Sequence, residues 1–491
     1  MKQAHSYFFK FLGLTLISVL LTTNAWGKSI TLDIRPGEGV TEQRKLSKYF
    51  APLKDTNLDT DVFILDSGKP GANALVLGGT HGNELAGQAA ALLLVENGVV
   101  VACGEAQAML AGLQGDYELV EYENALIVPG FIDTHIHYPQ TEIIAAYGEQ
   151  LLEWLETYTF PTEAQFSDPA YARSIAERFL DELLRAGTTT ALVFGTVHKA
   201  SVDSFFEACE ERNLRMIAGK VLMDRNAPDY LVDTPETGYQ DSKALIEKWH
   251  NRGRARYAVT PRFSPTSTPQ QLRRAGDLLA EFPGVYMHTH LSENKDEISW
   301  VRELFPDCED YLDTYDQAGL LGRRSVFAHC VHLEDREWQR MSESQSNIAF
   351  CPTSNLFLGS GLFHLSRAQK NNIRVGLGTD VGGGTSFSML QTLNEAYKVL
   401  QLRGEKLSPF KGFYLATLGS ADCLDLADLV GNFESGKEAD FVVLDKACTP
   451  LMDFRMQQCK DLFEELFVFS MLGDDRAVQA TYAAGVRVHQ R

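Results

Sequence analysis

The chain has 491 residues, of which 44% are hydrophobic and 22% charged, a composition typical of a soluble globular protein with a sizeable core. Its 45 basic and 65 acidic residues give a formal net charge of −20, so its field repels phosphate backbones and argues against nucleic-acid binding. The chain is too long for one ordinary core, although a (β/α)8 barrel alone can contain roughly 250 residues. We therefore expect two or three structural units.

Residues 1–28 have the features of a signal peptide. Lys2 and Lys10 precede an apolar stretch from Phe11 to Leu21, and Thr23-Asn24-Ala25 follows as a cleavage site. The apolar stretch is well short of the ~20 residues that span a bilayer, so we expect no stable membrane span. The eight cysteines are dispersed, without a CxxC pair, which favours reduced thiols and a cytoplasmic location. Because of the signal-peptide-like leader, export from the cytoplasm stays an alternative.

Residues 29–88 contain a candidate functional site of their own. The apolar run 74–77 leads into Gly78-Gly-Thr-His81-Gly-Asn-Glu84, and a strand that ends in a Gly-rich turn is a typical place for a site. This passage resembles the zinc motif of the aspartoacylase and succinylglutamate desuccinylase deacylases. The resemblance implies that His81 and Glu84 are zinc ligands. The further ligand and catalytic residues of those deacylases do not follow, so we interpret residues 29–88 as a truncated segment.

The remaining chain predicts a barrel between two β-rich flanks. Residues 89–128 contain short apolar runs with the hairpin signal Asn97-Gly98, and residues 430–491 return to a β pattern. We expect these flanks to pair as one small composite β-domain. Between them, in residues 129–429, amphipathic stretches alternate with short buried runs at 189–194, 216–221, 255–260, 285–289, 325–328, 347–350 and 375–378. This alternation predicts an α/β fold, a distorted (β/α)8 TIM barrel.

The strongest local signal is Pro129-Gly-Phe-Ile-Asp-Thr-His135-Ile-His137, where an apolar strand ends in two histidines. Alternate residues of a strand point the same way, so both imidazoles can face one metal ion. A His-x-His pair alone is a weak signal, because two surface histidines often have this spacing by chance.

Three further strand ends strengthen the interpretation. One run carries His290 and then Glu293, another ends at His329, and a third ends at Asp380 before a Gly-rich turn. In a barrel these positions meet at the carboxyl-terminal face, where such folds keep their active sites. Taken singly, each residue is also compatible with a structural polar group at the barrel mouth. His288 and His332 are interpreted as structural rather than ligating.

From about residue 90 to its end the sequence resembles the guanine deaminases of the amidohydrolase superfamily. The resemblance rests on the passages 129–140, 153–155, 260–263, 289–293, 350–355 and 378–380. It implies an amidohydrolase-type barrel, a homodimer, and one zinc ion per chain held by His135, His137, His290 and Asp380. Imidazole and carboxylate ligands also suit iron, so the metal stays open. The implied reaction is the hydrolysis of guanine to xanthine and ammonia.

The same resemblance assigns roles within the site. Asp380 accepts the proton of the activated water, Glu293 carries it to the ring and the departing amine, and His329 orients the reacting centre. Around the purine, Gln140 and Arg262 hydrogen-bond the edges and Phe263 packs on the ring. Arg262 donates to the C6 carbonyl oxygen, which adenine lacks. The implied substrate contacts are His137, Gln140, Arg262, Phe263, His290, Glu293, His329 and Asp380.

Several alternatives remain open from the sequence. Cys351 is a nucleophile candidate, but no Cys-His-Asn order supports it. Lys220 is the one candidate for the bridging lysine of binuclear amidohydrolases. The His-x-Glu and Pro-Cys-x-x-Cys signature of other zinc nucleobase deaminases is missing. The competing functions are an exported zinc deacylase or binding protein that uses His81 and Glu84, and a deaminase of another heterocycle, such as a pterin or triazine.

Overall fold

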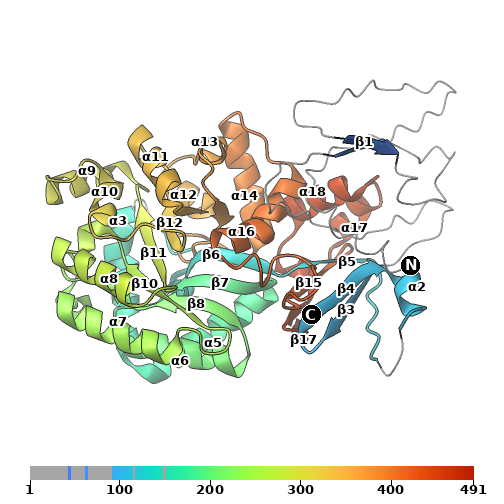
Figure 1. Ribbon diagram of the computed structural model, residues 1–491, viewed down its shortest axis with the longest axis horizontal. Helices are drawn as coiled ribbons and strands as arrows, with labels where there is room; N and C mark the ends of the chain where they lie inside the picture. Colours follow the sequence, from blue (N-terminus) through green and yellow to red (C-terminus); the bar gives the residue numbers. More distant parts are fainter. Residues whose placement is uncertain (1–41, 46–60, 65–90, 114–116, 148–150) are drawn as a thin grey trace. The chain divides into compact units, whose positions relative to one another are not determined.

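The computed structural model describes residues 42–45, 61–64, 91–113, 117–147 and 151–491 (Figure 1). The chain divides into two compact units, residues 1–76 and 77–491. In the first unit, β1 (Glu42–Lys45) pairs antiparallel with β2 (Asp61–Ile64). The leader and the passage that contains His81 and Glu84 lie outside the described residues, so their interpretation stays a prediction.

A nearly closed parallel barrel forms the centre of the second unit. Its strands lie in the order β14-β13-β12-β11-β10-β8-β7-β6, and the short β9 continues β8 and pairs with β10. Their bounds are β6 Phe131–His137, β7 Thr188–Phe194, β8 Arg215–Gly219, β9 Val221–Leu222, β10 Arg256–Pro261, β11 Tyr286–Leu291, β12 Ser325–His329, β13 Asn347–Phe350 and β14 Val375–Leu377. The predicted distorted (β/α)8 barrel is thus confirmed, with each predicted strand within one or two residues of its expected place.

The last strand meets the first through side-chain and loop contacts. The Thr134 hydroxyl donates to the carbonyl of Leu377 at 2.9 Å. Just beyond β14, the amide N–H of Asp380 donates to the carbonyl of His135, also at 2.9 Å. The closure of the barrel therefore fixes two predicted metal ligands relative to each other.

Helices surround the barrel because each presents an apolar stripe to the strands. In α5 (Pro169–Arg185), Asp168 caps the first turn, Pro169 begins the helix, and the buried side chains include Phe179 and Leu183. The other helices of the barrel region are α3 Leu151–Trp154, α4 Phe160–Glu163, α6 Lys199–Glu211, α7 Pro235–Trp249, α8 Pro269–Glu281, α9 Lys295–Leu304, α10 Tyr311–Asp316, α11 Asp335–Ser344, α12 Pro352–Phe357, α13 Leu365–Lys370, α14 Met389–Leu402, α15 Pro409–Ala416 and α16 Leu418–Cys423. Among the described helices, none is both long and apolar enough to cross a membrane.

Strands from both flanks of the barrel pair in one four-stranded antiparallel sheet, as the sequence predicted. Its order is β17 (Val486–Gln490), β16 (Val478–Ala483), β15 (Phe441–Asp445) and β5 (Ala125–Pro129). The hairpin of β3 (Ala91–Glu96) and β4 (Val99–Glu105) turns at Asn97 and Gly98, both with positive φ, and precedes the short α2 (Ala106–Leu110). Two helices that the sequence pattern did not predict, α17 (Pro450–Met456) and α18 (Leu462–Leu472), lie between β15 and β16.

Ion pairs join the barrel to this sheet domain. Arg215 on β8 and Arg254 both donate to the carboxylate of Glu438, at 2.8 and 2.6 Å, and Arg254 also contacts Asp440. Burial acts to raise the pKa of Glu438, but its two guanidinium partners lower it below the ordinary value. The carboxylate is therefore ionised and bridges the two parts of the second unit.

Candidate metal centre and active site

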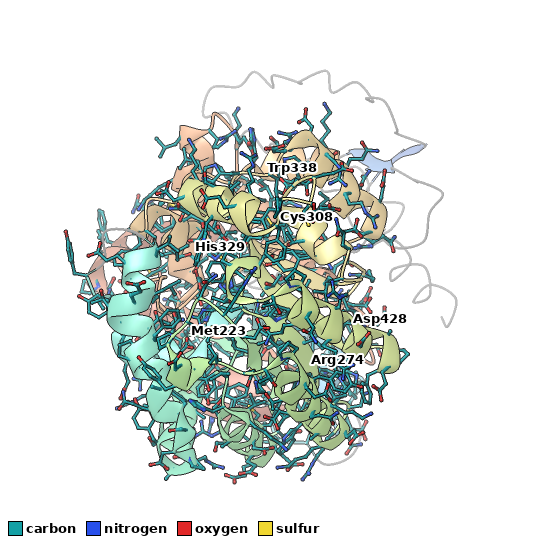
Figure 2. All side chains as sticks on the ribbon, turned by 90° about the vertical axis from the view of Figure 1, so that its left-hand side faces the viewer. Met223, Arg274, Cys308, His329, Trp338 and Asp428 are labelled. Carbon is teal, nitrogen blue, oxygen red and sulfur yellow. The ribbon has the colours of Figure 1, made fainter. Side chains whose placement is uncertain are left out.

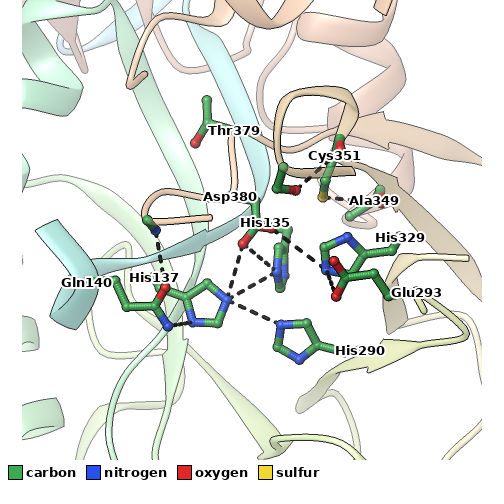
Figure 3. Close-up of polar contacts among 12 residues, drawn as sticks. His135, His137, Gln140, His290, Glu293, His329, Ala349, Cys351, Thr379 and Asp380 are labelled. Carbon is green, nitrogen blue, oxygen red and sulfur yellow. Dashed lines mark hydrogen bonds and ion pairs between the residues drawn. The ribbon is translucent and has the colours of Figure 1, made fainter. Parts of the chain in front are cut away.

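Four predicted ligands converge at the carboxyl-terminal ends of the barrel strands. His135 and His137 end β6, His290 lies on β11, and Asp380 follows β14 (Figure 3). Figure 2 faces this end of the molecule and labels His329, the last residue of β12, nearby. The alternation of strands and helices in the sequence therefore correctly predicted that these side chains meet at one end of the barrel.

Four of the six distances among these ligand atoms match the spacing around one tetrahedral ion. His137 Nε2 lies 3.2 Å from His135 Nε2 and 3.3 Å from His290 Nε2. Asp380 Oδ1 lies 3.2 Å from His135 Nε2 and 3.3 Å from His137 Nε2. Ligands about 2.0–2.1 Å from a tetrahedral zinc are roughly 3.3 Å apart. The donor set and its spacing fit one metal ion.

The protonation states agree with ligation. Burial lowers the pKa of His135, His137 and His290, in the case of His137 to about 3, so the three imidazoles are neutral and offer lone pairs. Burial alone acts to raise the pKa of Asp380, yet the adjoining His135 and His137 hold it well below its usual value. A carboxylate and neutral imidazoles are the forms that bind a divalent cation.

Contacts on the far side of each ring fix its orientation. His290 Nδ1 donates to the carbonyl of Arg262 at 2.7 Å, and His135 Nδ1 lies 2.7 Å from His288 Nε2. The Gln140 amide nitrogen lies 3.2 Å from His137 Nδ1. Such outer contacts orient metal-binding imidazoles. His288 lies behind a ligand, in agreement with its interpretation as structural.

Asp133 is a buried carboxylate of the site that the sequence analysis did not single out. Its Oδ1 accepts the backbone N–H groups of His135 and Thr379, each at 3.1 Å, and its Oδ2 accepts the Thr379 hydroxyl. Asp380 follows directly and has a positive φ of 52°, a sparsely populated conformation for an aspartate. Asp133 thus ties the strand that ends in His135 to the turn that presents Asp380. Its position two residues before His135, in the same motif, was the signal that could have revealed it.

Glu293 and His329 lie beside the predicted metal ligands. His329 Nε2 is 3.4 Å from Glu293 Oε2 and 3.8 Å from Asp380 Oδ2, and His329 Nδ1 donates to Asn355 at 2.8 Å. The Ser360 hydroxyl donates to Glu293 Oε1 at 2.9 Å. Burial, with the charge of Asp380 adding to it, raises the pKa of Glu293 to about 8. Glu293 can therefore take up and release a proton near neutral pH.

A small pocket opens over these groups. All eight predicted substrate contacts line it: His137, Gln140, Arg262, Phe263, His290, Glu293, His329 and Asp380. Leu151, Leu155 and Leu358 add apolar walls. Trp154 lines it too, and its buried Nε1 has no hydrogen-bond partner among the described residues. The pocket combines apolar walls with a few polar groups.

Arg262 is held by a carboxylate that the sequence analysis missed. Glu163, at the end of α4, accepts hydrogen bonds from both terminal nitrogens of the Arg262 guanidinium, at 2.8 to 3.0 Å. Both side chains are buried. Glu163 lies 99 residues before Arg262 in the chain, and no local motif connects the two positions.

The alternative chemistries find little support in the geometry. The Lys220 ammonium contacts the carboxylate of Asp233 and the carbonyl of Val221, so it is already paired with another acid. Burial raises the pKa of the Cys351 thiol well above its usual value, which keeps it protonated and poorly nucleophilic. His332 Nε2 donates to the carbonyl of Ser360 at 2.7 Å, which fits its interpretation as structural.

Comparison with known proteins identifies the family. Residues 126–488 match the Amidohydrolase family. The guanine deaminase of Escherichia coli K12 is 58% identical over 400 residues, which cover 82% of this chain and 91% of that protein. The probable guanine deaminase of Deinococcus radiodurans is 47% identical over 360 residues, 72% of this chain and 82% of that protein. The chain belongs to the guanine deaminases of the amidohydrolase family.

Solved structures of guanine deaminases share its fold. The E. coli enzyme superposes with a TM-score of 0.80 at 58% identity and covers 82% of this chain and 93% of that one. The guanine deaminase from C. acetobutylicum, solved with guanine bound in its active site, has a TM-score of 0.75 at 30% identity and covers 81% of this chain and 94% of that one. The family and the fold that the sequence predicted are therefore confirmed.

Proposed function

We propose that this guanine deaminase binds one zinc ion through His135, His137, His290 and Asp380 and hydrolyses guanine to xanthine and ammonia. The observation that carries the proposal is the cluster of four ligand atoms, 3.2 to 3.3 Å apart in each contact given above, beside the pocket that holds every predicted substrate contact. When bound, the ion supplies Lewis acidity and lowers the pKa of a water molecule toward about 7. The same ligands suit iron, so metal analysis accompanies every assay.

The residues of the chain divide the proton transfers between them. Asp380 is ionised and accepts a proton from the attacking water. Glu293, whose pKa is raised to about 8, receives this proton and delivers it to a ring nitrogen. The second proton of the water, from the hydroxyl now bonded to C2, passes through Glu293 to the amine, which leaves as ammonia. His329 lies within 4 Å of both carboxylates and has no hydrogen-bond partner on Nε2 among the described residues, so that nitrogen is available to the reacting centre.

Base recognition follows from the pocket walls. Phe263 and the leucines line the pocket, where they can pack on a flat ring, and we expect Gln140 and Arg262 to hydrogen-bond its edges. Arg262 donates to a carbonyl oxygen at C6, where adenine carries an amine that is itself a donor. A buried donor left without an acceptor costs about 1–3 kcal/mol, so the pocket disfavours adenine.

Turnover with matched variants tests this function. Purified, zinc-loaded protein should convert guanine to equal amounts of xanthine and ammonia. Asp380→Ala should abolish turnover, whereas Asp428→Ala, at an exposed position, should not change it. A folded, zinc-loaded protein without guanine turnover would refute the proposal, and a panel of pterins and triazines would then test the other heterocycles.

We further propose that the protein is a cytoplasmic homodimer. All eight cysteines are free, three of them partly exposed, which suits a reducing compartment. Sedimentation of the purified protein tests the dimer. Amino-terminal sequencing of protein from separated compartments tests the location, because a mature protein that starts near residue 26 and lies outside the cytoplasm would contradict it.

A further inference from the structure

The ion pair between Glu163 and Arg262 links the wall of the pocket to a residue that faces the substrate. Glu163 Oε1 accepts from Arg262 Nη1 and Nη2, each at 3.0 Å, and Oε2 accepts from Nη1 at 2.8 Å. The Glu163 side chain has no exposed surface and that of Arg262 only 3%. The ring of Phe160, on the same helix as Glu163, lies 5.5 Å from the guanidinium carbon. Two residues of α4 therefore hold one guanidinium.

The pairing leaves Arg262 able to serve a ligand. A guanidinium has five N–H donors in a rigid plane, and the contacts to Glu163 occupy at most three of them. At least two donors remain, with their directions set by the pair. Because Arg262 lines the pocket, a carbonyl oxygen in the plane of a bound ring can accept from them.

The pair also sets the charge of the pocket wall. Two opposite charges in contact inside the protein have no net charge, whereas Arg262 alone would present a buried cation to the ring. A buried ion pair adds little to stability, because desolvation offsets the attraction, but it fixes geometry where both partners are fully bonded. Because Arg262 lines the pocket, the fixed geometry of this pair can orient the free guanidinium donors toward a ligand.

Glu163 reaches a second predicted substrate contact. The Gln140 amide nitrogen lies 3.4 Å from Glu163 Oε1, and the Gln140 oxygen accepts the backbone N–H of Gly382 at 3.2 Å. The Arg262 backbone carbonyl in turn accepts from His290, a predicted metal ligand. One carboxylate thus connects two polar groups of the pocket, next to the metal centre.

We propose that Glu163 is the positioning residue that aims the Arg262 guanidinium at the C6 substituent of the purine and so sets the preference for a carbonyl over an amine there. This inference rests on the proposed function, in which Arg262 recognises that carbonyl. Glu163 does not touch the purine. It acts through Arg262, and its loss should change the choice of ring more than the chemical step.

The test compares two purines that carry no amine at C2, so neither undergoes the proposed reaction. Hypoxanthine has the C6 carbonyl and adenine has an amine in its place. Their dissociation constants are measured on the full, zinc-loaded chain for wild type, Glu163→Gln, Arg262→Gln and the double variant. Glu465→Gln is the matched control, because it breaks another buried ion pair, with Lys446, in the part of the chain outside the barrel.

We expect Glu163→Gln to lower the preference for hypoxanthine over adenine by about 10-fold or more, the scale of one hydrogen bond to a charged group. KM for guanine should rise by a similar factor while kcat changes less. The double variant should discriminate no worse than Arg262→Gln alone, because Glu163 acts through Arg262. Glu465→Gln should keep the wild-type preference.

Three results would overturn the inference. The first is a wild-type preference in Glu163→Gln, whatever its melting temperature, since that result would make the pair merely structural. The second is a double variant in which the two losses multiply. The third is a wild-type protein that does not distinguish hypoxanthine from adenine.

If Glu163→Gln does not fold, Glu163→Asp tests the same role, because it keeps the charge but withdraws it by one methylene. A lowered preference there supports the role and an unchanged one contradicts it.

The binding measurement separates this inference from the proposed function. Neither probe needs to react, so the preference for hypoxanthine can be measured even in a protein that does not deaminate guanine. Absent guanine turnover with an intact, Glu163-dependent preference would refute the deaminase alone. Normal turnover with an unaltered preference in Glu163→Gln would refute the role of Glu163 alone.

Discussion

Asp133 offers the most direct way to disturb the metal centre without touching a predicted ligand. Its carboxylate accepts backbone N–H groups from His135 and Thr379, each at 3.1 Å, and the Thr379 hydroxyl. Asp133→Ala removes these acceptors inside the barrel, where the side chain has no exposed surface. The turn that presents Asp380 then loses its tie to β6.

The size of the effect follows from the lost bonds. Each buried N–H left without an acceptor costs about 1–3 kcal/mol, so two of them lower the free energy of unfolding by about 2–6 kcal/mol. Removal of an outer contact of this kind also weakens metal binding by about 10- to 100-fold. Asp133→Asn keeps one acceptor oxygen and should lose less of both quantities.

Two measurements on the same samples test this expectation. Urea unfolding of the metal-free protein gives the loss of stability, and competition with a chelator gives the zinc affinity, with Asp428→Ala as the exposed control. This role of Asp133 is refuted if Asp133→Ala binds zinc as tightly as wild type, or if Asp133→Asn loses as much stability and zinc affinity as Asp133→Ala.

Further predictions concern the proton carrier and the link between barrel and sheet domain. Glu293→Gln keeps its shape but cannot carry a proton, so kcat for guanine should fall by about 100-fold or more at unchanged zinc content, and a wild-type kcat would contradict its role. Because burial raises the pKa of Glu293 to about 8 and its ionised form accepts the proton, kcat/KM should decline as the pH falls through that region; a flat profile between pH 5 and pH 9 would exclude this assignment. Glu438→Gln leaves Arg215 and Arg254 short of their shared carboxylate and should lower the free energy of unfolding by about 3 kcal/mol in a urea titration, whereas an unchanged midpoint would show that the bridge is unimportant.

The sequence predicted most of the barrel because its strands are short, buried and regularly spaced. Ser325–His329 and Asn347–Phe350 are buried along their whole length, and each shows in the sequence as a short apolar run, Val-Phe-Ala and Ile-Ala-Phe. The helices α17 and α18 escaped prediction. The segment that contains them, residues 450–472, lies between two strands of one sheet. It is outside the repeated strand–helix alternation from which the barrel was predicted.

The predicted ligands came from strand ends, where local sequence and topology agree. His135, His290 and Asp380 each follow or end an apolar run, so the fold class alone brings them to one face. Glu163 and Asp133 were missed for different reasons. Glu163 is distant in sequence from Arg262, and its partner is set by the packing of α4. Asp133 was overshadowed by the two histidines that follow it.

The segment 29–88 shows where such prediction stops. Only two residues, His81 and Glu84, resemble a zinc motif there. The passage does not predict a fold that would bring a third ligand to them. The deaminase site, by contrast, draws on four separate strand ends.

Guanine turnover and metal analysis on one purified sample are the sharpest test of zinc-dependent guanine deamination by this protein. We expect one zinc ion per chain and stoichiometric xanthine and ammonia. Activity should be lost on chelation and restored by zinc. A folded protein that holds one zinc ion and leaves guanine unchanged, or one whose turnover survives complete removal of metal, would contradict it.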